Sequence, residues 1–587
     1  MSLVSGHVHV RVSTRKNKDG TAVRYLQLTH NEWDPATKTS RPRVLHSFGR
    51  EDHLDRNAIA RLVASLSRLL GPATALDPGA SASTPAGLSF ISSRPLGGAF
   101  VLDHLWRRLG IDTAMARLLT GGKLDPRVER VLFALVANRA LDPASKLAAA
   151  RWVTRKTHID GLTEVSDDAC YRAMDWLIEI AAELEREVFW QLATLLDTEV
   201  DLLFFDTTST YFEIEEPDDP VARDPRGHRI ADTSTDEDAT TAEDKGEGGV
   251  GFGTHGKSKD FRDDLPQIVI GMAVTRDGIP VRVWCWPGNT TDTSLIRQAR
   301  EDIRDWTLSR IVWVADRGFS SARNRRELRR GGGHYIIGEK LRSGSTQATA
   351  ALSRPGRYQH VASNLQVKEV RIAEDERFVA CYNPEQADRD KHLREVMTDK
   401  LSDLISTTDT LSATKRAELR GRISTMPGLY RYLRVTPNGL LRLDKARVKT
   451  ETGLDGKYLL RCSDPHLSAQ DIALGYKQLL EVERGWRDMK TNLELRPVYH
   501  RLEDRIRAHV LLCWLALLLI RVAENTTAQT WRNMRDDLQE LHIGVFQGPA
   551  GTFRQRTELT PAQRDILAKL AIEPPKKIIE LAAPTPA

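Results

Sequence analysis

The order of strands and helices between residues 200 and 340 constrains the fold of this chain more than any other feature of its sequence. Short runs rich in β-branched and aromatic residues predict strands, and longer stretches with helical spacing predict helices. The strand runs lie at 200–205, 267–275, 279–286, 310–315 and 334–340, and the helical stretches at 292–306 and 320–330. Three consecutive strands followed by alternating helices and strands predict a mixed sheet with an α/β second half.

This β-β-β-α-β-α-β order is that of a ribonuclease-H-like core, which still needs a closing helix. The helix does not follow at once, because residues 341–467 carry mixed strand and helix patterns and are predicted to form an inserted domain. A strong helical pattern begins at Ser468, which has capping-box spacing to Asp471, and ends before Pro497. We therefore expect a multidomain α+β and α/β fold whose core is split between 200–340 and 468–525.

The rest of the chain is long enough for further structural units, since it brings the total to 587 residues. We predict a β-hairpin with a helix and a linker over 1–90, and an all-α, DNA-binding domain over 91–199. Residues 526–587 are predicted to be a C-terminal tail. The longest apolar run, 510–520, is shorter than the ~18 residues that cross a bilayer, so it predicts a buried helix.

Composition excludes several classes of protein. Hydrophobic residues make up 40% of the chain and charged residues 28%, which excludes collagen-like and wholly disordered chains. The five cysteines include no C-x-x-C pair, so neither a disulfide framework nor a zinc ribbon is indicated. The N-terminus lacks the apolar core and cleavage site of a signal peptide. We expect a cytoplasmic protein with no membrane partner.

The charge of the chain is unevenly distributed. The net charge is +5, yet residues 213–250 contain 13 acidic and 4 basic residues. The remainder is therefore distinctly basic, which favours a polyanionic partner such as DNA, with a merely solvated surface as the alternative. Residues 213–256 are predicted to be an acidic, Gly-rich loop, and its acidic segment 213–247 is predicted to be a disordered spacer rather than a regulator.

Three acidic residues are candidates for catalysis. Asp206 and Asp316 each directly follow an apolar strand run, and in α/β sheets sites are assembled at the carboxyl ends of strands. Glu483 lies on the predicted closing helix, where Tyr476, Glu483 and Lys490 recur every seven residues and so share one face. Three carboxylates from two strand ends and one helix suit two Mg²⁺ ions that clamp a phosphodiester. An exposed face with charge pairs is the alternative for the helix.

The chain resembles the DDE transposases of insertion sequences, the group numbered four and its relatives with an inserted domain before the catalytic glutamate. The resemblance covers about 100–525 and is carried by five segments. These are FFDTTSTYFE (204–213), KSKDFRDDLPQIVIG (257–271), PGNTTD (287–292), VADRGF (314–319) and YKQLLEVERGWRDMK (476–490). In the group's helix motif of Tyr, Arg, Glu and Lys, the position of the Arg is Leu479 here, and Lys477 or Arg487 are candidates to replace it.

The resemblance implies a Mg²⁺-dependent enzyme, with Mn²⁺ able to substitute, that cuts transposon ends and transfers them to target DNA. Asp206, Asp316 and Glu483 would hold two metal ions. A homodimer would act on two ends of double-stranded DNA. Further side chains are predicted to contact DNA, from the helix motif, from the basic helix after Asp316 and from the loop after the acidic segment: Tyr476, Lys490, Arg487, Arg323, Arg325, Arg326, Lys257 and Lys259.

Two other functions are compatible with the sequence. Residues 251–258 (GFGTHGKS) satisfy the phosphate-loop pattern of a nucleotide hydrolase, although a true phosphate loop leaves a strand and opens a helix. Here an acidic glycine-rich stretch precedes the pattern and Pro266 follows it closely. The other alternative is a protein of the same fold that binds DNA without cutting it.

Overall fold

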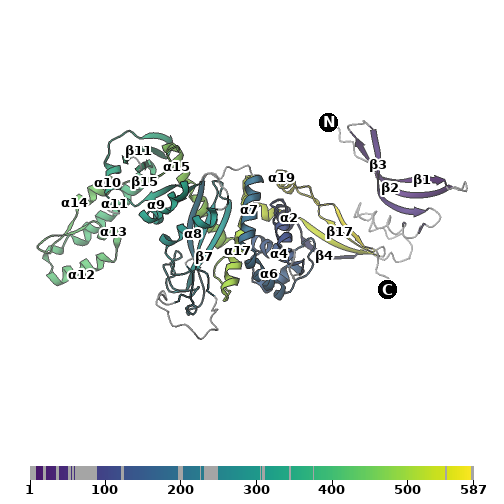
Figure 1. Ribbon diagram of the computed structural model, residues 1–587, viewed down its shortest axis with the longest axis horizontal. Helices are drawn as coiled ribbons and strands as arrows, with labels where there is room; N and C mark the ends of the chain where they lie inside the picture. Colours follow the sequence, from purple (N-terminus) through teal and green to yellow (C-terminus); the bar gives the residue numbers. More distant parts are fainter. Residues whose placement is uncertain are drawn as a thin grey trace, which may run out of the picture. The chain divides into compact units, whose positions relative to one another are not determined.

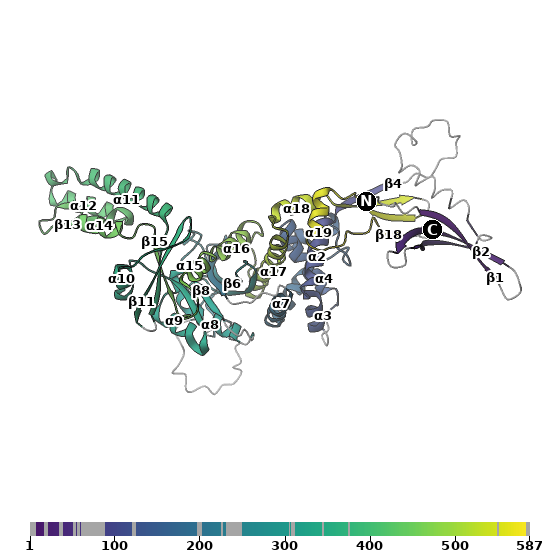
Figure 2. The same cartoon turned by 90° about the horizontal axis from the view of Figure 1, so that it is seen from above.

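The protein is described by a computed structural model that carries side chains, and Figures 1 and 2 show it in two views related by a 90° turn about the horizontal axis. The described residues are 8–16, 22–34, 39–50, 54–55, 59, 89–119, 125–195, 202–224, 227–230, 249–304, 306, 311–342, 345–373, 376–548 and 551–582. The chain divides into two compact units, Met1–Arg94 with Leu541–Leu559 and Pro574–Ala587, and Pro95–Glu540 with Thr560–Glu573. This division is coarser than the six segments predicted from the sequence.

The first unit is built from strands. One antiparallel sheet has the order β1-β2-β3, and a second has the order β18-β17-β16-β4. The strands are β1 (Val8–Lys16), β2 (Ala22–Asp34), β3 (Thr39–Arg50), β4 (Ser89–Pro95), β16 (His542–Gly548), β17 (Gly551–Arg556) and β18 (Ile578–Ala582). The predicted N-terminal hairpin is therefore joined by a third strand, while residues 17–21 and most of 51–88, where the helix and linker are predicted, lie outside the described residues.

The prediction of a C-terminal tail was wrong. Residues 526–587 contribute three strands to the first unit and two helices, α18 (Trp531–Gln539) and α19 (Pro561–Lys569), to the second. Helix α19 begins at a capping box in which the Thr560 hydroxyl accepts from the Gln563 backbone and the Gln563 side chain accepts from Thr560. The pattern HIGVFQG and this capping box were the available signals for ordered structure.

The predicted all-α segment over 91–199 is mainly helical in its described part, but residues 91–95 belong to strand β4 and 156–166 form a non-helical connection. Its helices are α2 (Gly97–Arg108), α3 (Ile111–Leu119), α4 (Val128–Leu141), α5 (Lys146–Arg155), α6 (Asp167–Glu179) and α7 (Ala181–Leu195). They pack around α17 (Glu503–Thr527), which contains the apolar run 510–520. Among the described helices α17 is the one long and apolar enough to cross a membrane, but 94% of its apolar window is buried, which confirms the predicted core helix.

The second unit contains one mixed sheet of nine strands in the order β10-β11-β12-β15-β9-β8-β5-β6-β7. The predicted core strands occur in the predicted order: β5 (Leu202–Tyr211), β6 (Gln267–Val274), β7 (Pro280–Pro287), then helix α8 (Asp292–Arg304), β8 (Val312–Ala315), helix α9 (Ala322–Arg329) and β9 (His334–Glu339). β5, β6 and β7 pair antiparallel, and β5, β8 and β9 pair parallel. The predicted β-β-β-α-β-α-β order is confirmed.

Helices cover both faces of this sheet. On one face a single buried cluster joins side chains of α7, α8 and α9, such as Phe189, Ala299 and Leu328, to strand residues that include Phe205 and Ala315. On the other face lie α15 (Ala469–Lys477), α16 (Leu480–Thr491) and α17, which contact β5 to β9 (Figure 2). The sheet therefore separates two helical layers, as expected for an α/β core.

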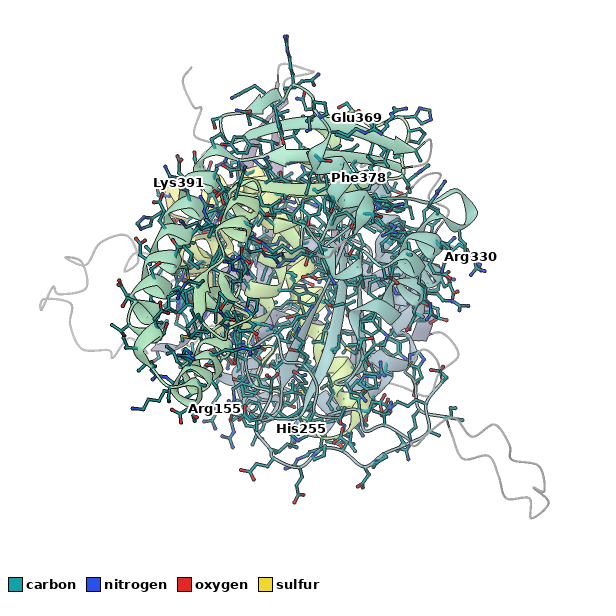
Figure 3. The ribbon with its side chains drawn as sticks, turned by 90° about the vertical axis from the view of Figure 1, so that its left-hand side faces the viewer. Arg155, His255, Arg330, Glu369, Phe378 and Lys391 are labelled. Atoms are coloured by element: carbon teal, nitrogen blue, oxygen red, sulfur yellow. The ribbon has the colours of Figure 1, made fainter. Side chains whose placement is uncertain are left out.

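Most strands of residues 341–467, the predicted inserted domain, belong to the core sheet, and the short hairpin within 433–443 forms a two-stranded sheet of its own. Strands β10 (Gln359–Ala362), β11 (Leu365–Ala373), β12 (Glu376–Tyr382) and β15 (Lys457–Cys462) extend the core sheet, because β15 pairs antiparallel with β9. In Figure 3 Phe378 of β12 lies among these strands and Glu369 lies on β11 near the sheet edge.

Helix α10 (Thr346–Ser353) packs on β11 and β12, whereas the remaining helices of this segment form a small lobe. It comprises α11 (Pro384–Ile405), α12 (Ala413–Ser424), α13 (Pro427–Tyr430), α14 (Lys445–Thr452) and the hairpin β13 (Leu433–Val435) with β14 (Leu441–Leu443), as Figures 1 and 2 both show. Its core contains Leu401, Ile423, Leu429 and Tyr432. We call this group of elements the helical lobe. The segment 341–467 is thus part sheet extension and part helical lobe.

The acidic loop is ordered over its described part. Val221 and Val250 form a β-bridge, Arg223 and Arg229 form another, and the Asp218 carboxylate accepts from the Gly253 backbone. The prediction of a disordered spacer was wrong for residues 213–224 and 227–230, and residues 231–248 lie outside the described part of the chain.

Candidate active site

Asp206 and Asp316 occupy neighbouring positions on two parallel strands. The last parallel pair between β5 and β8 is Phe205 with Ala315, and each aspartate is the next residue on its strand. Asp316 directly follows β8, as predicted. Asp206 does not end its strand, because β5 continues to Tyr211 as the antiparallel partner of β6. Asp206 therefore lies where the parallel pairing of β5 with β8 ends, although strand β5 itself continues beyond it.

Both aspartates face the same side of the sheet. Phe205 and Ala315 belong to the buried cluster under α7, α8 and α9, and successive side chains of a strand point to opposite faces. Asp316 keeps extended backbone angles of φ −69° and ψ 166°, so the alternation reaches it. Asp206 and Asp316 thus lie on the face that α15 and α16 cover.

The closing helix is broken, whereas the sequence predicted one continuous helix. Ser468 and Asp471 form the predicted capping box at the start of α15, but α15 ends at Lys477 and α16 begins at Leu480. At the break the Leu479 N–H donates to the Tyr476 carbonyl at 3.1 Å, an i to i+3 bond that tightens the turn. Tyr476 therefore lies on a different helix from Glu483, and the seven-residue spacing does not put them on one helical face.

A cleft of about 970 Å³ nonetheless brings Tyr476, Asp316 and Glu483 together. All three line it, with the carboxyl end of β9 and the base of the helical lobe as further walls. The Tyr476 hydroxyl donates to Asp316 Oδ1 at 3.4 Å. Burial raises the pKa of Tyr476, and the negative charges of Asp316 and Glu483 raise it further, so the hydroxyl remains a donor at neutral pH.

A glycine makes room for this tyrosine. A β-carbon on residue 338 of β9 would lie 2.4 Å from the Tyr476 hydroxyl oxygen, far inside contact distance, so the tyrosine reaches Asp316 because residue 338 is Gly338. The Tyr476 ring also stacks on Tyr458 of β15, with ring centroids 6.1 Å apart. The position of Tyr476 is therefore fixed from two strands.

The cleft also carries cationic side chains. Arg317 and Lys340 are exposed in its lining, next to Asp316 and the end of β9. On the lobe side, Arg342 and Arg431 both bind Glu451, which is 4% exposed, at 2.7 and 3.5 Å. Burial alone would raise the pKa of Glu451, but these arginines hold it below its usual value. Part of the positive charge is thus neutralised within the protein.

The Lys490 side chain is not exposed for contact with DNA in this structure. Its ammonium binds Asp260 Oδ1 at 2.7 Å, and Arg496 binds the same oxygen at 2.6 Å. The side chains of Lys490 and Asp260 are 10% and 7% exposed, and burial lowers the pKa of Lys490. The predicted DNA contact of Lys490 is therefore occupied by an internal ion pair, which joins α16 to the loop before β6. Sequence reasoning missed Asp260, because its partners lie 230 and 236 positions away.

Of the other residues considered at the helix motif, one is buried, one is hydrogen-bonded within the protein and one is exposed. Leu479 is buried, and Lys477 donates to Asn364 at 2.8 Å in the turn between β10 and β11. Arg487 is exposed on α16, one turn after Glu483. Of the two candidates to replace the missing arginine, Arg487 is the one whose side chain faces solvent.

Two of the three arginines on the basic helix α9 that are predicted to contact DNA are exposed. Arg323 and Arg326 are exposed, whereas the Arg325 side chain is 19% exposed and lies 3.7 Å from Glu339, which also binds Arg461. Arg325 thus belongs to a partly buried charge cluster, unlike Arg323 and Arg326. Figure 3 shows Arg330, just beyond α9, at the periphery of the molecule.

The glycine-rich loop does not have the structure of a phosphate loop. No helix follows residues 251–258. A β-carbon at Gly251 would lie 2.2 Å from the Asp218 carbonyl oxygen, and one at Gly256 would lie 2.0 Å from the Gly288 carbonyl oxygen. These glycines allow backbone segments to pack closely, which accounts for the pattern. Lys257 is exposed, but the Lys259 ammonium already donates to the Thr207 carbonyl at 2.7 Å, so Lys259 needs no DNA to order it.

The acidic residues have the chemistry that a divalent metal ion needs, but their side chains are not arranged as a complete metal site. Carboxylate oxygens are the ligands of hard divalent cations. Within the described ranges, however, no three Asp, Glu, His or Cys side chains are grouped closely enough to hold an ion. Asp316 and Glu483 share the cleft, while Asp206 is absent from its lining. The five cysteines are free and buried.

Comparison with known proteins places these elements in a family. Among solved structures, the cryo-EM structure of the piggyBac transposase synaptic complex with hairpin DNA matches at 9% identity, covering 77% of this chain and 82% of that one. The TM-score of this match is 0.32. No curated protein matches. Residues 238–519 match the transposase DDE domain, and residues 10–76 match the N-terminal domain of IS1634-family transposases. With both domains in one chain, the protein belongs to the insertion-sequence transposases of the DDE type.

Proposed function

We propose that this transposase cuts DNA at the terminal inverted repeats of its own element and joins the freed ends to target DNA by a cut-and-paste route. Water attacks a phosphodiester at the element end, and the bond from phosphorus to the departing 3′-oxygen breaks. The freed 3′-hydroxyl then attacks a phosphodiester of the target, and the bond from that phosphorus to the 3′-oxygen of the target strand breaks, which leaves a 3′-hydroxyl on the target. The observation that carries the proposal is the cleft shared by Asp316 and Glu483, with Asp206 beside Asp316 on the adjacent strand.

We infer that Asp206, Asp316 and Glu483 hold two Mg²⁺ ions, for which Mn²⁺ can substitute. Transposase DDE domains generally use divalent cations. When bound, such ions neutralise charge on the attacking and leaving oxygens of the phosphodiester. Because the three carboxylates do not form a finished site among the described residues, assembling it requires side-chain movement. Glu483 is exposed, and so its side chain is free to turn.

The protein's own groups have distinct roles in this proposal. The Tyr476 hydroxyl donates to Asp316 and holds that carboxylate in one orientation. Arg317 and Lys340 supply positive charge for the phosphates of a strand in the cleft. Arg487 takes the backbone contact that the family motif assigns to the position of Leu479. Lys490 positions the loop before β6 through Asp260 rather than gripping DNA itself.

DNA outside the cleft is proposed to contact Arg323 and Arg326 on α9 and Lys257 in the loop before β6, all of which are exposed. Since two ends of an element must be paired, we propose a homodimer in which each active site acts on one end. Both proposals rest on the membership of the family and on exposed charge.

The test is a nicking assay with the full-length chain and a duplex that carries the terminal repeats from the DNA flanking the reading frame. Mg²⁺ or Mn²⁺ should support nicking, and Asp206→Asn, Asp316→Asn and Glu483→Gln should each abolish it without lowering Tm or weakening the gel shift. The matched control is Asp390→Asn, an acidic residue on the lobe side of the same cleft, which should keep activity.

The alternatives give different results in the same preparations. A nucleotide hydrolase would release phosphate from ATP and lose that activity in Lys257→Ala. A DNA-binding protein without catalysis would shift the duplex and never nick it. Nicking that persists unchanged in Asp316→Asn would refute the proposed site.

A further inference from the structure

The loop before β6 displays one aromatic side chain in an unusual backbone conformation. Phe261 is 93% exposed, the highest value among the exposed large hydrophobic residues, and its φ is +58°. Positive φ is uncommon for a residue other than glycine and costs on the order of 1–3 kcal/mol, which the surrounding structure must impose. An isolated exposed apolar side chain is ordinary, but one held there by a strained backbone suggests a use.

The surrounding loop holds Phe261 in this conformation. On one side Asp260 is fixed by Lys490 and Arg496. On the other side Arg262 binds Asp264 at 2.8 Å, and its guanidinium lies over the Tyr211 ring, 5.3 Å from the centroid. The Ser258 backbone also donates to Asp263 at 2.7 Å, which closes the loop around its tip. Phe261 is therefore presented on a rigid support.

The same loop is attached to the two elements that carry Asp206 and Glu483. The Lys259 ammonium donates to the carbonyl and hydroxyl of Thr207, at 2.7 and 2.6 Å, and Thr207 is the residue after Asp206. Lys490 lies seven residues after Glu483 on α16, about 10 Å along the helix axis. The exposed ring is thus built on the framework of the proposed active site.

The chemistry around the ring fits DNA. Lys257, Lys259 and Arg262 flank it in sequence, and Lys257 is exposed, while Lys259 and Arg262, like the loop's carboxylates at 260, 263 and 264, have partners within the protein. A nearby segment adds a second exposed aromatic, Tyr499, which is 77% exposed. That segment is tied to the loop by Arg496. An exposed aromatic side chain beside cations is the arrangement that stacks on nucleic-acid bases while the cations meet phosphates.

We propose that Phe261 stacks on a base of the element end beside the cleavage site and stabilises a locally unpaired duplex there. This inference rests on the proposed function, since it assigns a DNA contact to the same site. The strained conformation serves to hold the ring out of the protein, so that no part of the stacking surface is lost to intramolecular packing.

The experiment compares Phe261→Ala, Phe261→Gly and Phe261→Tyr with the wild type in the nicking assay. The substrate is the terminal-repeat duplex with 2-aminopurine at the junction, in a fully paired form and in a form with a mismatch there. Phe261→Ala should reduce nicking of the paired end about 10- to 100-fold, the size expected for one base stacked on an aromatic ring. The mismatched end should largely restore it, because it is already unstacked, and Phe261→Tyr should stay near wild type.

Phe261→Gly separates this role from a structural one. Glycine accepts positive φ without strain, so this variant should keep or raise Tm. It should still lose nicking, and it should also lose the increase in 2-aminopurine fluorescence that we expect when the wild type unstacks the base at the junction. Trp190→Ala, which removes an exposed aromatic from α7, is the control and should leave both signals unchanged. Equal nicking of the paired end by wild type and Phe261→Gly would overturn the inference. If the wild type itself fails to nick either duplex, the proposed function is what fails.

Discussion

The hydroxyl oxygen of Tyr476 lies only 2.4 Å from the position that a β-carbon on residue 338 would take. Tyr476 therefore packs directly against the backbone of Gly338 at the wall of the cleft. The contact lies between the strand next to Asp316 and the helix before Glu483. The orientation of Asp316 therefore depends on the absence of a side chain on the neighbouring strand.

Gly338→Ala should lower the free energy of unfolding by about 1–3 kcal/mol, as inserting a methyl group into a packed site does, and should reduce nicking. Thermal and denaturant unfolding measure the first effect. Gly338→Ala with Tyr476→Phe should cost less than the two single changes together, because the clashing oxygen is gone. Gly421→Ala is the control: nothing lies within 4 Å of that site on α12, so it should stabilise the protein slightly. Strict additivity of the two changes would contradict the contact.

Asp260→Ala should be strongly destabilising, because it leaves Lys490 and Arg496 without their shared carboxylate in a site that is largely buried. The expected loss is about 3–5 kcal/mol, measured by urea unfolding. Asp264→Ala, in the same loop, removes a fully exposed pair with Arg262 and should leave the midpoint unchanged. Similar midpoints for the two variants would show that the Asp260 cluster does not hold the loop.

Glu185 should make stability fall as pH rises from about 4.5 to 7. Burial raises its pKa to about 7, and the nearby Arg282, 3.3 Å away, only partly offsets this. Between the two values the unfolded carboxyl loses its proton and the folded one keeps it, so the folded state binds more protons and loses stability with increasing pH. The loss is on the order of 3 kcal/mol.

Unfolding of wild type and Glu185→Gln across this pH range measures the effect. The difference between the two should change with pH, whereas Glu183→Gln, at an exposed position on the same helix, should run parallel to the wild type. A parallel Glu185→Gln curve would mean that Glu185 is ionised in the folded protein. The His500 pKa, lowered by burial to about 4, acts in the opposite sense and is common to all three proteins.

Arg323→Ala with Arg326→Ala should weaken binding to duplex DNA regardless of sequence and reduce the salt dependence of binding. Each lost phosphate contact lowers the slope of log K against log salt by about 0.9. Titrations at several salt concentrations give the slope. Arg371→Ala removes an exposed arginine from β11 and serves as the control, with no expected change. An unaltered slope in the double variant would remove α9 from the DNA surface.

The core order and the family could be predicted because both depend on local signals. Strand runs, turn residues and the motifs around Asp206, Asp316 and Glu483 are each contained in a few consecutive residues, and the insertion-sequence DDE family is confirmed. The phosphate-loop pattern also looked local, but its meaning depended on Asp218 and Gly288, which pack against its glycines from distant segments.

What the sequence did not reveal are relations between distant segments. Pairing of β15 with β9, which merges the expected inserted domain with the core sheet, joins strands more than 100 residues apart. The ion pair of Lys490 with Asp260 is equally non-local. The break between α15 and α16 was missed because nothing at 478–479 is a helix breaker: neither glycine nor proline occurs there.

The continuous ladder from β12 through β15 and β9 to β8 has a mechanical consequence. The helical lobe is joined to this ladder where the Asn383 backbone donates to the Gly456 carbonyl at 2.8 Å, at the roots of α11 and β15. A load applied to the lobe is therefore transmitted through strand hydrogen bonds to the register of β8, and so to Asp316. A rotation of the helical lobe relative to the sheet is therefore expected to occur at this root, because a bend within the sheet would require its strands to slide past one another.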